Sequence, residues 1–459
     1  MNPQRTVLSI KRPSCYFSNY ILLLFCCYFL IPSSAVGQEH APNRIRTQLL
    51  EKITNSDVFN KGFTGFALFD PEERKYICTH QADKYFTPAS NTKILTFMAA
   101  QTLLRSEWPV IHYNAMGDTL MLWGTGYPLL LHPDFVGFDT LGHWLAQRPE
   151  KTWLIANGHF YDQRYGEGWS WDDYPYGYQM EKAALPVYGN AVNFTKHGHL
   201  APIEVQPEYF EDQFIYENPY TISRYEDRNL FTFGDRALAA EELDRSISFR
   251  YELPVVASLL KDTFHRTVQF TSDTLPRVQG RKTLYAPIPD TVFQLLLHDS
   301  DNFIAEQLLQ MTSAQRYGYI HTGRILRFLT DTLLARTPQP LEWVDGSGLS
   351  RYNKLTPQSA VTVLDQLQQQ IPQERLFQLF PAGGVSGTIK SWYEGEDDRP
   401  YIFAKTGTLR HVHCLSGYLV SSSGKTYIFS FMHNNYPDKI SELKEEMQVV
   451  LEWLRAELE

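Results

Sequence analysis

The sequence predicts an α/β (α+β) fold in which helices flank a sheet and a β-rich segment interrupts the main domain. Apolar residues recur at helical spacing near both ends of the chain, at 45–53 and at 440–458. Short strand patterns lie close to these helices, within 65–80 and 401–432. From about 108 to 280 the chain instead alternates short strands, turn signals and aromatic residues. We therefore expect a main domain at 38–107 and 281–459, with a β-rich insertion at 108–280 of one or two small subdomains.

Length and composition are those of a globular protein with a large core. The chain has 459 residues, of which 43% are hydrophobic and 20% charged. Its formal net charge is -9, which gives no electrostatic reason to expect a nucleic-acid partner.

The N-terminal residues 1–37 have the pattern of a signal peptide. Basic residues precede an uncharged apolar run at 20–31, and small residues at 33–37 suit signal peptidase cleavage. The run is too short for an ordinary membrane span, so no stable membrane insertion is expected. The sequence predicts an exported protein, periplasmic or otherwise extracytoplasmic.

Cysteine is rare outside this leader, which contains Cys15, Cys26 and Cys27. Cys78 and Cys414 each lie in a strand pattern. Export would permit a disulfide between them, but two cysteines do not form a framework, and two buried free thiols are favoured.

The remaining elements follow in chain order. A Pro-Glu-Glu turn joins strands at 65–70 and 74–80, and a helix begins at the next apolar run, near Ser90. In the insertion, an aromatic cluster at 168–178 either stacks on sugar rings or, as we favour, packs the insertion against the main domain. The C-terminal part combines helices around a turn at Ser300, a helix at 317–334, two polar loops at 345–351 and 381–387, three strands at 401–405, 414–421 and 425–432, and the last helix.

Ser90 and Lys93 form a candidate catalytic pair. They are three positions apart at the start of an apolar helical run, so both side chains point the same way. A lysine amine that is desolvated among apolar residues can lose its charge and accept the proton of a serine hydroxyl. Alone, Ser-x-x-Lys is a common pattern that also fits a serine helix cap and a surface lysine.

Two further motifs make the catalytic interpretation the stronger one. Ser300-Asp301-Asn302 lies in a turn between two apolar helical patterns. Lys405-Thr406-Gly407 follows a short strand pattern, and its glycine allows a ligand to approach the backbone closely. Ser-x-x-Lys, Ser-x-Asn and Lys-Thr-Gly in this order are the motifs of penicillin-binding proteins and class A β-lactamases.

The chain resembles the D-alanyl-D-alanine carboxypeptidases of the penicillin-binding protein 4 type (serine peptidase family S13), which are also DD-endopeptidases. Besides the three motifs, several pieces look like landmarks of that family: Gly117-Asp118-Thr119-Leu120, Gly168-Trp169, Trp171-Asp172-Asp173, Ala305-Glu306 and the loop at 345–350. The resemblance implies a penicillin-binding, transpeptidase-like domain with an antiparallel sheet, peptidoglycan stem peptides as substrates, and β-lactam antibiotics as covalent inhibitors.

The resemblance also implies roles for the matched residues. Ser90 would be the acylated nucleophile, Lys93 its general base and Ser300 a proton relay toward the leaving amine. Asn302 would hold the substrate backbone and orient Lys93. The substrate-binding strand would contribute Lys405, Thr406, Gly407 and Thr408, the first two to the substrate carboxylate and the backbone N–H of Thr408, with that of Ser90, to an oxyanion hole.

Other chemistries and functions fit parts of this sequence. His411 and His413, like His197 and His199, could contribute to a metal site, but neither pair has a convincing third ligand, so no metal and no cofactor is expected. A serine β-lactamase shares all three motifs, and a non-catalytic wall-binding or antibiotic-sensing relative would keep the fold. The intact motifs and the long insertion favour a D-Ala-D-Ala carboxypeptidase, with minor transpeptidation left open.

Overall fold

A five-stranded sheet joins the two ends of the chain in the computed structural model, which describes residues 41–104, 106–271, 280–395, 399–437 and 439–458. All neighbouring strands in this sheet are antiparallel, and Phe66 is paired with Phe431 at its centre. The predicted signal peptide and its three cysteines lie outside the described residues. In sheet order the strands are β14 (Ile402–Leu409), β15 (Val412–Val420), β16 (Thr426–Asn434), β1 (Phe63–Asp70) and β2 (Lys75–His80).

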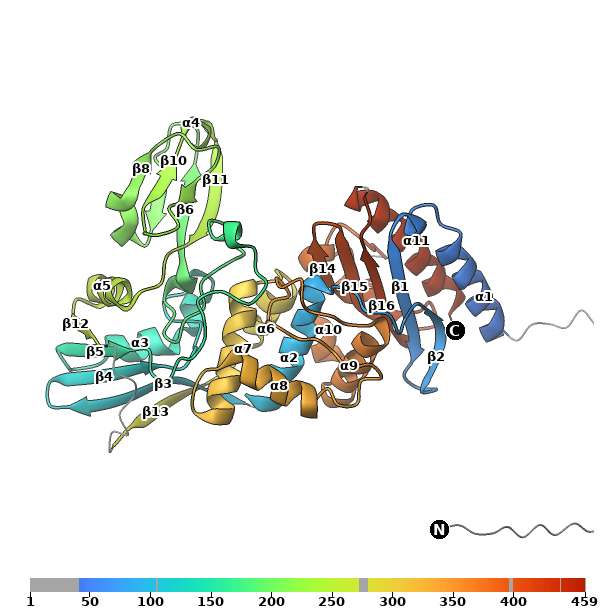
Figure 1. Ribbon diagram of the computed structural model, residues 1–459, viewed down its shortest axis with the longest axis horizontal. Coiled ribbons are helices and arrows are strands. Elements are labelled where there is room, and N and C mark those ends of the chain that lie inside the picture. The colour runs from blue at the N-terminus through green and yellow to red at the C-terminus, as the bar shows by residue number, and fades with distance from the viewer. Residues whose placement is uncertain (1–40, 105, 272–279, 396–398, 438, 459) are drawn as a thin grey trace, which may run out of the picture. The chain divides into compact units, whose positions relative to one another are not determined.

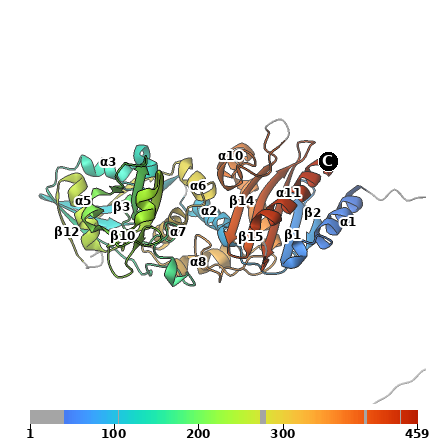
Figure 2. The same ribbon diagram turned by 90° about the horizontal axis from the view of Figure 1, so that it is seen from above.

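Helices cover both faces of this sheet. On one face lie α1 (Ala41–Thr54) and α11 (Ile440–Glu457), whose apolar residues recur every three or four positions and are buried against the strands. On the other face α9 (Pro357–Gln370) packs on β1 and β16. Figures 1 and 2 both show α1 and α11 on the opposite side of the sheet from the remaining helices of the main domain.

The centre of the main domain is α2 (Thr92–Leu103), which is buried along most of its length. It packs against α6 (Asp290–Leu297), α7 (Asn302–Tyr317) and α9. A helix that is apolar on nearly every side must be surrounded by other elements, and this one is. Two further helices complete this part of the fold: α8 (Thr322–Thr332) and α10 (Gln373–Leu379).

The predicted helix at 317–334 is present as α8 but begins later than expected, at Thr322, because Tyr317 is the last residue of α7. Gly318 ends α7 in the left-handed conformation, with φ of 75°. His321 then caps α8 by accepting a hydrogen bond from the backbone N–H of Arg324. A glycine followed by a capping side chain therefore stops one helix and starts the next within four residues.

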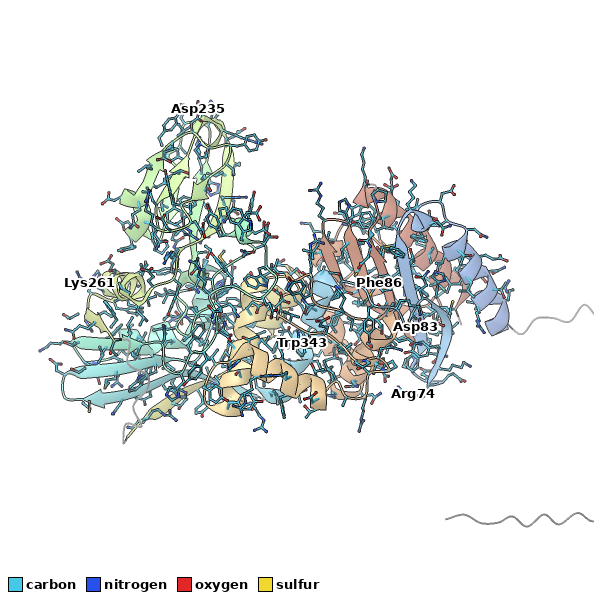
Figure 3. All side chains as sticks on the ribbon, in the orientation of Figure 1. Arg74, Asp83, Phe86, Asp235, Lys261 and Trp343 are labelled. Atoms are coloured by element: carbon cyan, nitrogen blue, oxygen red, sulfur yellow. The ribbon has the colours of Figure 1, made fainter. Side chains whose placement is uncertain are left out.

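Residues 107–287, slightly more than the predicted insertion at 108–280, contain a mixed five-stranded sheet and two small three-stranded sheets, which Figure 1 shows in colours from teal through green to yellow. The larger sheet, with α3 (Thr140–Ala146) and α5 (Leu253–Phe264), has the order β12 (Thr267–Phe270), β5 (Thr152–Ala156), β4 (Thr119–Gly124), β3 (Glu107–Met116) and β13 (Lys282–Pro287). The first small sheet has the order β11 (Glu242–Ser248), β6 (Ala191–His197), β7 (Glu204–Gln206). The second has the order β8 (Phe214–Tyr216), β10 (Phe231–Phe233), β9 (Ser223–Arg224). Helix α4 (Asp235–Ala239) follows β10 in the chain, and its first residue, Asp235, is labelled in Figure 3.

The two cysteines in the described chain, Cys78 on β2 and Cys414 on β15, are both free and buried, which confirms the expectation of unpaired thiols. Burial raises the pKa of Cys78 to about 11 and that of Cys414 to about 12, so both are held as unreactive thiols. Among the described residues, no helix combines the length and hydropathy needed to cross a bilayer.

We expect Phe431→Ala to lower the free energy of unfolding by about 3–5 kcal/mol. Phe431 is fully buried on β16, and its ring contacts those of Phe59 and Phe66 at centroid distances of 5.2 and 4.9 Å. Urea unfolding followed by circular dichroism measures the change, with Val449→Ala on the exposed side of α11 as the control. Equal stability of the two variants would contradict this assignment of the core.

Candidate active site

Ser90 and Lys93 lie where a short 3-10 turn (Ala89–Asn91) runs into α2. Ala89 has a positive φ of 48°, an unusual value for a residue with a side chain. The first turn of α2 places the Lys93 Nζ atom 3.0 Å from the Ser90 Oγ atom, as the three-residue spacing predicts.

The Lys93 amine has two other partners, and both are acceptors only. Nζ donates to Oδ1 of Asn302 at 2.5 Å and to the backbone oxygen of Ser347 at 2.6 Å. A neutral amine has two N–H groups and one lone pair. When these two oxygens take both N–H groups, the lone pair is directed at the Ser90 hydroxyl. The geometry therefore suits a base that removes the Ser90 proton.

Burial also lowers the pKa of the Lys93 amine, which favours its action as a base. The Lys93 side chain is fully buried, and loss of hydration lowers its pKa to about 8. The carboxylates of Asp301, Asp345 and Glu306 oppose this shift but do not cancel it. A sizeable fraction of the amine is then neutral at mildly alkaline pH, unlike an exposed lysine.

Ser300 lies between α6 and α7, in the turn predicted from the sequence, with a positive φ of 61°. Its Oγ atom accepts a hydrogen bond of 2.9 Å from Nζ of Lys405, which also donates to the backbone oxygen of Thr406. Burial lowers the pKa of Lys405 well below its usual value, the charge of Lys93 lowers it further, and Asp299 opposes both effects. Ser300 and Lys405, which are far apart in the chain, thus form a second serine–lysine pair.

Asn302 connects the Ser300 turn to Lys93 and to the insertion. It is the first residue of α7, and Asp301 caps that helix by accepting from the backbone N–H of Ile304 at 2.6 Å. The Asn302 Nδ2 atom donates to the backbone oxygen of Tyr178 at 2.8 Å, while Oδ1 accepts from Lys93. Its amide orientation is consequently fixed from both sides.

Strand β14 passes very close to the Ser90 turn, and glycine makes this possible. A Cβ atom on Gly407 would lie 2.2 Å from the Pro88 oxygen and 3.0 Å from the Ser90 nitrogen. Asn91 ties the same two segments together by donating to the Lys405 oxygen at 2.8 Å. The backbone of Thr408, the next residue along the strand, is thereby brought near that of Ser90.

Thr408 and Thr406 make different side-chain contacts. The Thr408 hydroxyl is bonded to Nδ1 of His413, its cross-strand partner on β15, at 2.9 Å. Burial lowers the pKa of His413 to about 3, so this imidazole is neutral. The Thr406 hydroxyl is buried and bonded to that of Thr388 at 2.7 Å.

A cleft of about 610 Å³ opens above these groups. Of the eight predicted site residues, four line it: Ser90, Ser300, Asn302 and Thr408. The other four are buried: Lys93, Lys405, Thr406 and Gly407. The two serines are therefore exposed to the cleft, whereas the two lysines lie beneath its floor. Charged side chains of both signs complete the wall: Asp172, Asp173, Arg351 and Arg410.

Part of the aromatic cluster of the insertion packs against the main domain, and part of it is exposed. Trp169 packs as we expected, because its indole N–H donates to Oδ2 of Asp345 at 2.8 Å. Trp343, labelled in Figure 3, donates to the Asp345 backbone oxygen at 2.7 Å. Packing does not account for Trp171, however, which is 76% exposed.

In the two histidine pairs considered as metal ligands, three rings are hydrogen-bonded to other groups. His411 lies in the turn before β15, where its ring is bonded to the Tyr436 oxygen, and His413 is occupied by Thr408. His197 is bonded to Glu242 instead. No group of three His, Cys, Asp or Glu side chains suited to a metal ion occurs in the described residues.

Sequence reasoning identified the polar loop at 345–351 but missed that it supports Lys93. The contribution of Ser347 is a backbone oxygen, which leaves no side-chain pattern in the sequence. Asp345 accepts from the backbone N–H groups of Gly348 and Ser350 at 2.9 and 2.7 Å and so shapes that loop. Glu306 had a visible signal, an acidic residue within an otherwise apolar part of a helix, but no function was predicted for it.

A comparison with protein families matches residues 46–214 and 271–456 to the model of the D-Ala-D-Ala carboxypeptidase 3 (S13) family. The chain belongs to this family. Membership confirms the resemblance inferred from the motifs and the predicted reaction class, a serine-type D-Ala-D-Ala carboxypeptidase.

Relatives of known name agree with this assignment. The D-alanyl-D-alanine carboxypeptidase DacB of Haemophilus influenzae is 23% identical over 419 residues, which cover 81% of this chain and 85% of the relative. The penicillin-sensitive carboxypeptidase A of Dictyostelium discoideum is 32% identical over 101 residues, covering 20% of this chain and 19% of the relative.

Solved structures show the same fold. Penicillin-binding protein 4 of Haemophilus influenzae superposes with a TM-score of 0.71 at 19% identity, covering 89% of this chain and 99% of that one. A predatory peptidoglycan endopeptidase of Bdellovibrio bacteriovorus superposes with a TM-score of 0.50 at 14% identity, covering 85% and 92%. The predicted fold class is therefore confirmed.

We expect Gly407→Ala in this S13 enzyme to push β14 away from the Ser90 turn. The added Cβ would contact backbone atoms, which cannot rotate aside, so we predict a loss of about 1–3 kcal/mol in unfolding free energy and at least a tenfold lower rate of D-alanine release. Gly137→Ala is the matched control, since nothing lies within 4 Å of its Cβ position and its φ is not positive. Wild-type release rates in Gly407→Ala would contradict the close approach.

Proposed function

We propose that this S13 enzyme removes the terminal D-alanine of peptidoglycan stem peptides, and cleaves D-alanyl cross-links, through an acyl-enzyme on Ser90. One observation supports this assignment above all: the buried Lys93 amine is hydrogen-bonded to the oxygens of Asn302 and Ser347 and lies within hydrogen-bond distance of the Ser90 hydroxyl.

Acylation begins with proton transfer from the Ser90 hydroxyl to the Lys93 amine. The Ser90 oxygen attacks the carbonyl carbon of the penultimate D-alanine, and the carbonyl electrons move onto its oxygen. Lys93 becomes an ammonium whose third N–H is directed toward the Ser90 oxygen, while Asn302 and Ser347 keep the other two. No metal ion is required for this step.

The backbone N–H groups of Ser90 and Thr408 are proposed to bind the oxyanion. Their segments are held together at Gly407, which supports this role. Donors fixed in this way, and removed from water, are worth about 3–4 kcal/mol each in acyl transfer.

Collapse of the intermediate breaks the C–N bond, and the departing D-alanine amine needs a proton. Ser300 is placed to deliver it, since it lines the cleft and its oxygen already accepts from Lys405. With that lone pair occupied by Lys405, the Ser300 hydroxyl is available to donate into the cleft. The Lys93 ammonium then gives up the proton that it took from Ser90, which restores the Ser300 hydroxyl and the neutral amine. Water attacks the acyl-enzyme with Lys93 again as base.

Recognition of the substrate carboxylate is assigned to the end of β14. Lys405 is buried, so it contributes positive potential from below, and Thr408 lines the cleft. Thr406 is proposed to assist, with its hydroxyl held by that of Thr388. Asn302 would hold the peptide backbone of the substrate from the opposite wall.

β-Lactams mimic the same acyl group and should acylate Ser90. A solved penicillin-binding protein 4 from Haemophilus influenzae carries a β-lactam, with a TM-score of 0.64 to this chain. We also propose that residues 1–37 direct export, which would place the enzyme where peptidoglycan lies.

We predict that benzylpenicillin adds its full mass to the purified protein, that the adduct persists, and that Ser90→Ala forms none. Intact mass spectrometry gives the result directly, and Ser258→Ala on α5 is a control serine that should acylate like the wild type. Drug hydrolysis without an adduct would instead indicate a β-lactamase. Neither adduct nor hydrolysis would indicate a non-catalytic relative and overturn the proposed function.

A further inference from the structure

Glu306 is a buried carboxyl group beside the catalytic pair that the proposed mechanism does not use. It lies one helical turn after Asn302 on α7, so both side chains are on the same face of the helix. The residue is 2% exposed. Its Oε1 atom accepts the backbone N–H of Ser347 at 2.8 Å, and its Oε2 atom is buried with no hydrogen-bond partner among the described residues.

Ser347 links this carboxyl to Lys93 through a single residue. Its N–H points to Glu306, and its oxygen accepts from the Lys93 amine at 2.6 Å. Removing the Glu306 contact would leave the Ser347 N–H buried and unpaired, which favours a shift of the whole residue. The position of the Ser347 oxygen that accepts from Lys93 therefore depends on the hydrogen bond between the Ser347 N–H and Glu306.

The rest of the loop is clamped around Ser347. Thr96 on α2 donates to the Gly346 oxygen at 2.6 Å. A Cβ atom on Gly346 would lie 2.6 Å from the backbone oxygen of Ala305, so the loop touches α7 backbone to backbone. These contacts hold Ser347 between α2, which carries the base, and α7, which carries Glu306.

The charges around Glu306 couple it to Lys93. Burial and the Asp345 carboxylate raise the pKa of Glu306 to about 7, while Lys182 opposes the shift. Lys93, with a pKa of about 8, is affected in turn by Glu306, Asp345 and Asp301, and its charge is felt by Lys405. Glu306 thus changes charge close to neutral pH, and its charge acts on Lys93, whose amine titrates in the same range.

We propose that Glu306 is a positioning residue for the Ser90–Lys93 pair: its carboxyl fixes the Ser347 oxygen on which the lysine amine rests, and its charge sets how readily that amine takes the Ser90 proton. This inference rests on the proposed roles of Ser90 and Lys93. An ionised Glu306 stabilises the Lys93 ammonium and so favours the protonated base before attack. A neutral Glu306 leaves the amine more often unprotonated and ready to react.

Glu306→Gln separates charge from position. Glutamine keeps an oxygen that can accept from Ser347 but has no charge. We expect the pH midpoint of acylation by benzylpenicillin to move down by about half to one unit, which makes acylation at pH 7 about three- to fivefold faster than in the wild type. Stopped-flow or quenched mass spectrometry from pH 5.5 to 9.5 gives the profile.

Two variants serve as comparisons. Glu306→Asp keeps a charge but shortens the side chain, so acylation should slow at every pH while the midpoint stays near that of the wild type. Asp365→Asn removes another buried carboxylate, one that pairs with Arg74 and Gln369, and should leave both rate and midpoint unchanged. A Glu306→Gln midpoint equal to that of the wild type would overturn the proposal.

A wild-type measurement keeps the test decisive if Glu306→Gln does not fold. Two coupled groups give an acidic limb that is shallower than a single ionisation, whereas an isolated Lys93 gives a limb with unit slope. A unit slope in the wild type would contradict the proposal. If the wild type forms no adduct at any pH, the proposed function itself fails, and that result is distinct from a failure of the Glu306 inference.

Discussion

Burial of the Lys93 amine is the constraint on which the rest of this structure depends. Moving an ammonium out of water costs much free energy unless its hydrogen bonds are satisfied. Burying the neutral amine costs much less. The chain meets this constraint with one oxygen from each of three segments: Ser90 at the start of α2, Asn302 at the start of α7 and Ser347 in the loop beyond α8. The fold of the main domain brings these three together around a helix that is almost entirely buried.

Close backbone contact and local strain accompany this arrangement. Gly407 and Gly348 both touch the Ser90 turn so closely that a Cβ atom on either would lie within 2.2 Å of a backbone oxygen. Ala89 and Ser300 each have a positive φ, which ordinarily costs free energy. The sheet and the helices on its two faces hold these strained residues in place. The geometry of the reactive loops therefore depends on the rigid core.

The sequence predicted the main parts of the fold and the chemical groups of the site, but not how they are held. Ser90 and Lys93 could be paired from helical spacing alone, and the order of the three motifs linked them to Ser300 and Lys405. The start of α8 was placed five residues too early, because the turn at Gly318 and the capping role of His321 were not recognised. The Ser347 oxygen could not be predicted, since a backbone group has no sequence signature and its position depends on contacts with Thr96 and Glu306.

The most direct test of this account is the ionisation of Lys93 itself. In protein labelled with ¹³C at the lysine ε-carbon, the Lys93 signal can be assigned by its absence in Lys93→Met and followed by NMR as the pH is raised. We predict a midpoint near pH 8, well below that of the exposed lysines, because burial lowers this pKa to about 8. A midpoint at the value of an ordinary exposed lysine would show that the amine stays charged at neutral pH and would contradict its assignment as the base.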